Sequence, residues 1–464
     1  MTRKPFITVL IILLAAIFLA SCSSCDADTA SSNTGTQQGP GGSTPPGKPG
    51  EGGSGGPGGS GSGSSSVTYS GATEIKSAAT QADQTYASAT SDESALLIST
   101  SEAVTITNPT VTKSGSSNGG DSCNFYGLNA AVLVKGGSTT TITGGTITTD
   151  ASGANGVFSY GGNGGSNGAA GDGTKVIISD TTITTTGSGS GGIMTTGGGT
   201  TEAYNLTVTT SGQSSAAIRT DRGGGTVTVD GGTYTSNGLG SPAIYSTADI
   251  TVENADLISN LSEGVCIEGK NTITLVNCNL TATNTKCNGN AKFLDTIMIY
   301  QSMSGDADSG TSVFTMTGGV LTSNNGHVFH VTNTNAVINL NNVEIVNNDT
   351  DGILLSVCDD GWSGGSNIAT MNASGQTLTG TILVGSDSTL TLNLKDDSTF
   401  TGTFSGVIKN ASGTSVSTSI GTVNVTIEEG STWTLTADTY ITTLTNNGTI
   451  DKGSYTLYVN GKAV

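Results

Sequence analysis

Residues 216–260, AAIRTDRGGGTVTVDGGTYTSNGLGSPAIYSTADITVENADLISN, decide the fold of this chain. The stretch reads twice in nearly the same way, and Ile244 follows its counterpart Ile218 after 26 residues. Each pass holds three short runs of alternating apolar and polar residues, separated by Gly, Ser, Asn or Asp. Alternation with a period of two indicates strands, and the small polar residues indicate turns. Three strands in each repeat are typical of one coil of a parallel β-solenoid.

The same unit continues in both directions. Aligned on the apolar residue after the second turn, successive units lie 36, 36, 25, 26, 23, 23 and 41 residues apart. The aligned residues are Val111, Ile147, Ile183, Val208, Tyr234, Leu257, Leu280 and Leu321. The base coil is therefore about 23–26 residues long, and the longer gaps hold inserted loops. Because one coil cannot bury its inner face alone, stacked coils must shield one another. We predict an all-β, right-handed parallel β-helix with three short strands per coil.

Composition supports the fold and limits the possible partners. The chain has 464 residues, of which 70 are Gly and only 11% are charged, which is typical of a turn-rich all-β protein. The formal net charge is −19, with only 16 Lys and Arg. Nucleic-acid binding is excluded on this ground, because phosphate contacts need clustered cations. Anionic polysaccharides would also be repelled unless a divalent cation bridged them.

The N-terminus predicts where the protein resides. Arg3 and Lys4 precede an apolar run at 6–20, which is too short for a membrane span and typical of a signal peptide. The run ends in Leu-Ala-Ser before Cys22, which resembles a bacterial lipobox. The resemblance implies that Cys22 carries a lipid, so that the protein contacts the membrane through this anchor on the outer side of the cell envelope. The alternative is an ordinary signal peptide with a chance Cys.

Changes in composition along the chain divide it into five segments. The first two are a signal peptide and a Gly/Ser/Pro tether, which has too few apolar residues to fold. A cap and first coil follow, with a short helix expected near Glu74–Thr80, then the β-helix with edge loops, then shorter coils that extend and close the stack. A separate small β-domain is the alternative for the last segment. The predicted bounds are 1–21, 22–66, 67–103, 104–374 and 375–464.

The coils with Gly-Gly-Thr-x-Thr turns, such as that at 231–235, resemble bacterial surface proteins of the pectin-lyase-like superfamily, including adhesin-like ones. The resemblance covers roughly residues 70–464 and implies a right-handed parallel β-helix. It implies no single function, because this fold hosts lyases, hydrolases, tailspikes and adhesins. The Trp-Ile-Asp-His stretch of pectate lyases is missing, as are the motifs of polygalacturonases. No catalytic residue is therefore carried over.

The first strand of each coil predicts a row of outward-facing side chains rich in aromatic rings. By alternation, the row consists of Phe158, Tyr160, Met194, Arg219, Tyr245, Glu268, Tyr300 and Phe329. Rings and an arginine on a flat sheet suit sugar stacking. The alternative is that the long loops fold over the row and bury it as a second core.

Two loops supply further candidate ligand-binding residues. Arg219 and Arg222 flank Asp221, and such arginines clamp carboxylates or sugar hydroxyls. The alternative is an Arg–Asp pair that fixes the turn. The loop that contains Asp359, Asp360 and Trp362 suits either a Ca²⁺ ion or a stacked sugar. A weak candidate calcium site consists of Asp172, Asp306, Asp308, Asp359 and Asp360, and the alternative is solvated turn acids.

The histidines and cysteines give no metal-binding spacing. His327 and His330 are the only histidines, and we expect structural roles for them, with His330 facing inward or towards the turn. Cys278 can reach Cys287, and Cys266 can reach Cys123 or Cys358, but the sequence does not determine disulfide pairing.

These observations favour a lipid-anchored, monomeric surface protein that binds glycans or another surface without catalysis, in the manner of an adhesin. A polysaccharide lyase or glycoside hydrolase of the same fold is the first alternative. A structural spacer without a ligand is the second, and it requires the outward row to be covered by loops.

Overall fold

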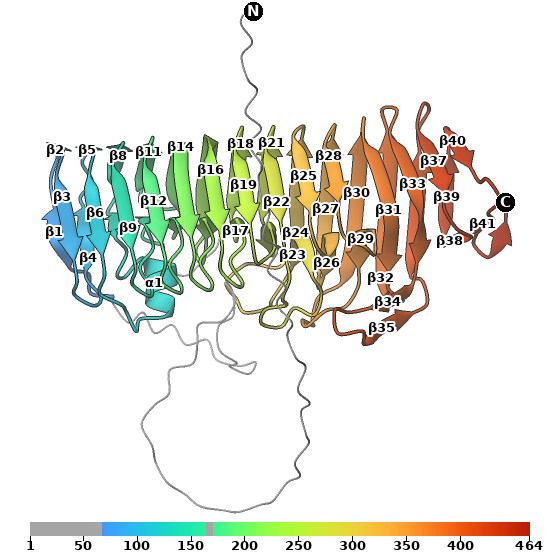
Figure 1. The fold of residues 1–464 in the computed structure, drawn as a ribbon, viewed down its shortest axis with the longest axis horizontal. Coiled ribbons are helices and arrows are strands. Elements are labelled where there is room, and N and C mark those ends of the chain that lie inside the picture. Colours follow the sequence, from blue (N-terminus) through green and yellow to red (C-terminus); the bar gives the residue numbers. More distant parts are fainter. Residues whose placement is uncertain (1–66, 164–169) are drawn as a thin grey trace, which may run out of the picture. The chain divides into compact units, whose positions relative to one another are not determined.

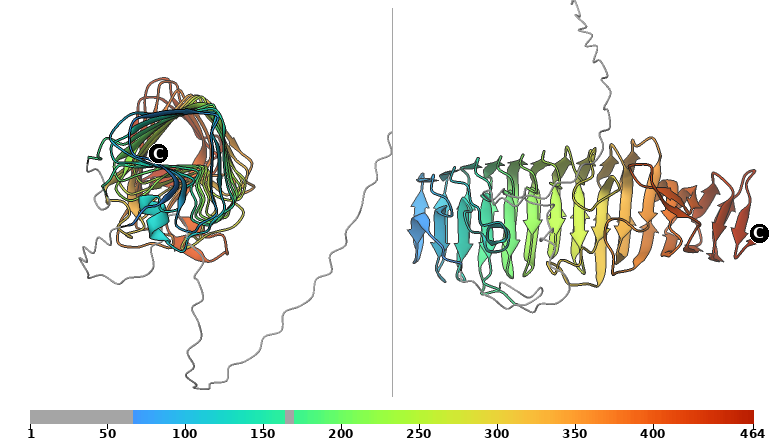
Figure 2. Two further views of the ribbon diagram at one scale, coloured as in Figure 1. Left: turned by 90° about the vertical axis from the view of Figure 1, so that its left-hand side faces the viewer. Right: turned by 90° about the horizontal axis from the view of Figure 1, so that it is seen from below.

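The computed structural model describes residues 67–163 and 170–464, all within one compact unit. The predicted signal peptide, the predicted lipid attachment at Cys22 and the predicted tether all lie outside the described residues. The unit is a right-handed parallel β-helix, as the sequence predicts (Figure 1). Viewed along the stack, the coils superimpose on one outline, with the loops on its outside (Figure 2).

Sheet A contains fifteen strands, each hydrogen-bonded to the corresponding strand of the next coil. The pairing is parallel throughout, because the chain travels once around the stack between neighbours. In stacking order the strands are β1 (Gly71–Ile75), β4 (Ser94–Ser99), β7 (Val132–Lys135), β10 (Val157–Tyr160), β13 (Ile193–Thr196), β15 (Ile218–Thr220), β17 (Ile244–Ser246), β20 (Val265–Glu268), β23 (Asp295–Tyr300), β26 (His327–Thr332), β29 (Ile353–Val357), β31 (Thr377–Val384), β33 (Thr399–Ser405), β37 (Thr432–Leu435) and β40 (Thr449–Asp451).

Sheet B contains 22 strands in two rows, joined where β14 and β16 run through both. The first row is β2 (Ala79–Ala82), β5 (Val104–Thr107), β8 (Thr139–Thr143), β11 (Lys175–Ser179), β14 (Gly199–Thr210), β16 (Gly225–Ser236), β18 (Asp249–Glu253), β21 (Thr272–Val276), β24 (Thr311–Thr317), β27 (Thr334–Asn341), β30 (Asn367–Ser374), β32 (Ser388–Lys395), β36 (Thr422–Ile427) and β39 (Thr443–Asn446). The second row adds β3 (Thr85–Ser88), β6 (Thr110–Lys113), β9 (Thr146–Thr149), β12 (Thr182–Thr185), β19 (Asp256–Ser259), β22 (Asn279–Ala282), β25 (Val320–Ser323) and β28 (Glu344–Asn347).

In the second row, the coils stack in the register that the aligned apolar residues of the sequence predict. Val111 pairs with Ile147, and every later member of the aligned series pairs with the next, as far as Leu280 with Leu321. All of these side chains point inward and are fully buried in one continuous apolar core. The period-two alternation therefore decides which face of each strand is buried, and stacking supplies the apolar neighbours.

Coils after β28 have fewer strands but continue the same stack. β31, β33, β37 and β40 extend sheet A, while β30, β32, β36 and β39 extend sheet B. The second row of sheet B ends at β28, because β31 runs directly into sheet A through a bend at Gly380, whose φ is 126°. Short peripheral strands complete this end of the unit: β34 (Val407–Lys409), β35 (Ser415–Thr418), β38 (Thr439–Ile441), β41 (Leu457–Val459) and β42 (Lys462–Ala463).

Two local predictions are wrong. The stretch Glu74–Thr80 is not helical, because Ile75 and its neighbours already stack on the next coil as β1 and β2. Among the described residues the one α-helix is α1 (Asp121–Tyr126), within an inserted loop, and none is long and apolar enough to cross a membrane. The thiols of Cys123, Cys278 and Cys358 are free, so none of the three considered disulfides forms.

Candidate functional site

The outer face of sheet A is covered by loops. Phe158, Met194, Arg219 and Tyr245 stack in successive coils, as expected from alternation, yet none is more than 2% exposed. The row continues through Cys266 and Met298. Its apolar members form two small cores outside the main one, and Tyr160 and Tyr300 contribute to them. Of the two alternatives for this row, the structure therefore has the one in which loops cover the outward-facing side chains and exclude solvent from them.

Phe329 does not belong to this row. Ile297 pairs with Phe329 and Met298 with His330, so the strand sits one residue later than the sequence reading placed it. Phe329 consequently faces the main core, where its ring lies 5.9 Å from that of Phe314. His330 takes the outward position, so the expectation that it faces inward or towards the turn is also wrong. Two consecutive apolar residues, Val328 and Phe329, made the alternation ambiguous here.

Beneath the loops lies an arginine–carboxylate cluster, formed by Arg219, Asp221, Arg222, Glu268 and Asp306. The first three come from β15 and its following turn, Glu268 ends β20, and Asp306 lies in the loop after β23. Arg219 Nη2 is 2.5 Å from Asp221 Oδ2, with both side chains buried. Arg222 donates to Asp306 Oδ1 from Nη2 at 2.6 Å and from Nε at 3.1 Å. The expected Arg–Asp pair at the turn is present, and a second pair links it to a distant loop.

The carboxylate of Glu268 is enclosed by hydroxyl groups. Tyr245 and Tyr300 donate hydrogen bonds to its Oε2, at 2.5 and 3.0 Å, and Ser302 donates to its Oε1. Burial raises the pKa of Glu268 to about 7, although these hydrogen bonds lower it. Burial likewise raises the pKa of Asp221 to about 6 against the attraction of Arg219. Negative charge on Asp306 raises both values further.

The arginine–carboxylate cluster is accessible to solvent only at its edge. Arg222 is about one third exposed, at 32% of its side chain, and its guanidinium lies 4.2 Å from the ring centre of Phe125 on α1. Ser304 is exposed and donates to Asp306 Oδ2 at 2.9 Å. A carboxyl group with a pKa near 7 that accepts hydrogen bonds from two tyrosines has the properties of a general acid or base. A polymer would meet Arg222 and Ser304 first, and the loops would have to move before it touched Glu268.

The loop with Trp362 is part of the cover. Trp362 is 8% exposed, and its ring centre lies 4.8 Å from that of Tyr300. Asp359 accepts a hydrogen bond from Asn367, and Asp360 accepts one from the backbone N–H of Lys292 at 2.6 Å. The ring of Trp362 is thus engaged by a neighbouring tyrosine in the position where a stacked sugar was expected.

The five candidate calcium ligands are not brought together. Asp172 accepts from Thr174, and Asp308 pairs with Lys270, while the other three have the partners given above. Within residues 67–163 and 170–464, no group of three or more His, Cys, Asp or Glu side chains is arranged to hold a metal ion.

A second buried polar cluster was missed by sequence reasoning. Ser356 Oγ lies 2.6 Å from His330 Nδ1 and 2.7 Å from His327 Nδ1, and His330 Nε2 faces Asp360 Oδ2 at 3.4 Å. The residue types match those of a nucleophilic triad. However, Ser356 and His330 are fully buried, and Phe293 stacks on His330 with ring centres 4.7 Å apart. The arrangement acts as a sealed network under the loop that carries Phe293. Only coil register, which pairs His330 with Ser356, could have revealed it.

Comparison with protein families, curated proteins and solved structures finds no match to this chain. The assignment of a site therefore rests on geometry.

The outward-facing residues along the first row of sheet B are partly or fully exposed within the described part of the chain, and we call this surface the Thr/Asn face. One outward position in successive coils is occupied by Thr80, Thr105, Thr141, Ile177, Glu202, Thr228, Thr251, Thr274, Thr315, Asn339, Asn372, Asn393, Thr426 and Thr445. None of these residues is buried. Apart from Ile177, these residues are polar, so polar groups recur at the strand spacing of about 4.8 Å along this face.

Three asparagines on this face form a hydrogen-bonded amide ladder. Asn372 Nδ2 donates to Asn339 Oδ1, and Asn393 Nδ2 donates to Asn372 Oδ1, each at 2.9 Å. Asn339 in turn donates to Thr315 Oγ1 at 3.2 Å. Asn339 and Asn372 of the ladder line a hollow of about 330 Å³, which Lys395 also lines. Each amide keeps further donors and acceptors in a fixed orientation for a ligand.

Proposed function

We propose that this chain is a lipid-anchored cell-surface β-helix that binds a glycan or another surface polymer without chemically altering it. We place the binding surface on the Thr/Asn face rather than on the covered row of sheet A. The single observation that carries the proposal is the ladder of Asn339, Asn372 and Asn393 beside its hollow. Oriented amides and threonine hydroxyls suit the hydrogen-bonding groups of a sugar polymer lying along the stack.

The anchor and charge support the same proposal. The lipobox-like sequence before Cys22 and the Gly/Ser/Pro tether would present the β-helix at the outer side of a membrane. The net charge of −19 and the mixture of Thr and Asn favour a neutral polymer over an anionic one. Rigidity of the stacked strands means that little order has to be gained when a ligand binds.

A glycan array tests the proposal with a matched pair of variants. The triple variant Asn339→Ala, Asn372→Ala, Asn393→Ala removes the ladder. The control, Thr146→Ala, Thr182→Ala, Thr207→Ala, removes three stacked exposed hydroxyls from the other row of sheet B. Loss of three hydrogen bonds should weaken binding by about tenfold or more, while the control binds as the native protein does. Binding of no glycan, or equal loss in both variants, would refute the proposal.

Catalysis on a polysaccharide is the second candidate, and the environment of Glu268 favours it. A carboxyl with a pKa of about 7 can donate and accept a proton near neutral pH, and Arg222 offers a partly exposed cation for a uronate. Incubation with uronate-containing polymers should then yield unsaturated products or new reducing ends, and Glu268→Gln should abolish them. A broad panel of polymers that yields no product would count against this activity.

A further inference from the structure

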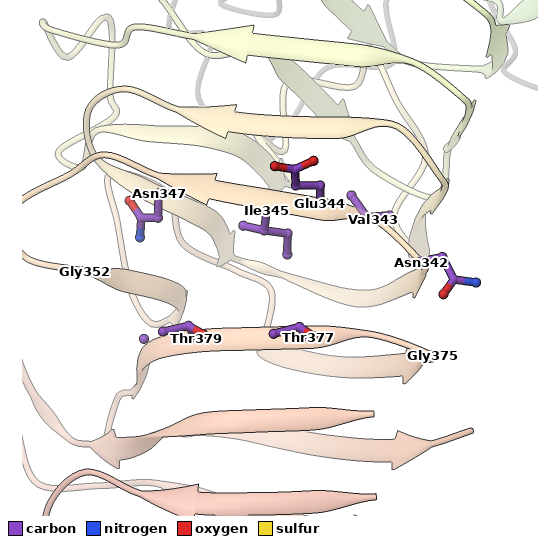
Figure 3. A pocket seen from close by; sticks show the side chains of 10 residues that line it. Asn342, Val343, Glu344, Ile345, Asn347, Gly352, Gly375, Thr377 and Thr379 are labelled. Carbon is purple, nitrogen blue, oxygen red and sulfur yellow. The ribbon is translucent and has the colours of Figure 1, made fainter. Parts of the chain in front are cut away.

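The transition from three-strand to two-strand coils leaves a groove between β28 and β31. Figure 3 shows Glu344, Ile345 and Asn347 on one side and Thr377 and Thr379 on the other. The groove has a volume of about 580 Å³, within the range of about 300–1,000 Å³ that is typical of ligand pockets. It exists because β28 pairs with β25 on one side and has no strand partner on the other among the described strands.

Both walls of the groove are open strand edges. Glu344 N–H donates to Gly319 O across the pairing with β25, so residues 344 and 346 face that strand. Because N–H and C=O groups of successive residues point to opposite sides of a strand, those of Ile345 and Asn347 face the groove. On β31, Thr381 N–H donates to Gly352 O of the preceding coil, so Thr377 and Thr379 face the groove from the other side. Two parallel edges thus present unpaired backbone groups to the same space.

The ends of the groove show how these backbone groups can be satisfied. At one end the side-chain amide of Gln376 accepts from Val343 N–H at 2.8 Å and donates to Val343 O at 2.6 Å. Gln376 therefore bonds to β28 as a residue of a neighbouring strand would. At the other end the coils meet at Gly352 and Gly380, where an added Cβ on Gly380 would lie 2.5 Å from Gly352 O. Between these two contacts the strand edges remain without such a partner.

The charge around the groove indicates the kind of occupant. Glu344 is exposed on its wall, and Asp349 and Asp351 follow in the next turn. Among the described residues that line the groove there is no Lys or Arg. Ile345 is half-buried and packs against the core, which gives the groove an apolar floor. Unpaired strand edges bind extended peptides through main-chain hydrogen bonds, and side-chain contacts then select the sequence. An acidic wall favours a basic side chain on that peptide.

We propose that this groove binds an extended peptide segment of a partner protein by strand addition between β28 and β31. A Lys or Arg of the peptide faces Glu344, and a short aliphatic residue packs on Ile345. The site is separate from the Thr/Asn face, so a failure of glycan binding leaves it untouched. The bound peptide adds a short strand between these two successive coils, and its flanking parts leave towards solvent.

Selection from a library of random seven-residue peptides displayed on phage tests the proposal. The expected result is enrichment of sequences that combine a basic residue with β-branched residues, since these favour an extended strand. Lack of enrichment above an unselected background overturns the proposal.

The best enriched peptide is then measured by fluorescence anisotropy against variants of the full chain. Glu344→Lys should raise its Kd by about fivefold or more, because charge reversal replaces attraction by repulsion. Glu253→Lys, an exposed acid on β18, serves as the charge-matched control and should leave the Kd unchanged. Glu344→Gln provides a milder variant if reversal disturbs folding. A proline at the centre of the peptide should weaken binding about tenfold, because it removes a main-chain donor.

Three results would overturn strand addition. One is equal Kd values for Glu344→Lys and Glu253→Lys. Another is an unchanged Kd for the proline-containing peptide. The third is binding of chitohexaose that is lost in Glu344→Lys, which would make the groove a sugar site.

Discussion

The outer faces of sheet A and sheet B are built by the same alternation of side chains, yet one is buried and the other is accessible to solvent. Tyr245 on β17 and Thr251 on β18 belong to one coil, and both point away from the core. Tyr245 is 1% exposed, whereas Thr251 remains accessible. The difference lies in the insertions, which flank sheet A and carry α1, β34 and β35 along one edge of the stack (Figure 1). A solenoid can therefore keep one side for its loops and another for contact with a large flat partner.

The largest expected difference between the two faces concerns Arg219. Its replacement by Ala leaves the carboxylate of Asp221 buried without its ion-pair partner, at an expected cost of about 3–5 kcal/mol. Arg222→Ala should cost less, because Arg222 is one third exposed and its partner Asp306 keeps its hydrogen bonds with Ser304. Urea denaturation of both variants measures this. Equal losses would show that burial of the pair is not what matters, and the double variant Arg219→Ala, Asp221→Ala should recover part of the loss.

A smaller effect should appear in how the free energy of unfolding depends on pH. The pKa of Glu268 is about 7 in the folded protein against the usual 4.5, so the fold favours its protonated form. This contribution is fully present below pH 4.5 and is lost as the pH rises through 7, by about 3 kcal/mol at most. Glu268→Gln should flatten the fall between pH 5 and 8, leaving the smaller fall that Asp221 causes in the same direction.

Comparison of the two proteins isolates Glu268, because the other titrating groups are common to both. Burial lowers the pKa of His327 to about 3, which acts in the opposite direction but equally in each protein. Denaturation curves at pH 5, 6, 7 and 8 supply the measurement. Parallel curves for the native protein and Glu268→Gln would contradict the assignment.

The smallest effect belongs to the open face. Thr251→Ala should change the free energy of unfolding by no more than about 0.5 kcal/mol, because its side chain is partly exposed and points away from the core. Tyr245→Ala, from the same coil, should cost several-fold more by emptying part of the covered core. Thermal unfolding of the two variants compares the faces directly. A large loss for Thr251→Ala would mean that the Thr/Asn face also supports the stack.

Most of the fold could be predicted, because turn residues and alternation mark most coils; the coil that contains Val328 and Phe329 is an exception. Ile183, Val208 and Tyr234 pair as the sequence spacing requires. The covering of the outward row could not be predicted, since alternation says which way a side chain points and nothing about the path of a distant loop. Asp306 reaches Arg222 across 84 residues of chain, and Ser356 meets His330 only through coil register. Such contacts depend on the conformation of irregular loops, which the alternation pattern does not determine.

Parallel stacking also determines how the rod would respond to mechanical tension. The hydrogen bonds between coils lie roughly perpendicular to the strands, so a pull along the stack strains one rung at a time. The last coils are joined over the fewest residues, since β36 pairs with β39 over four residues and β37 with β40 over three, against eight between β30 and β32. Under load, the end that carries β37 and β40 should therefore detach first, one strand at a time, while the coils before it stay stacked.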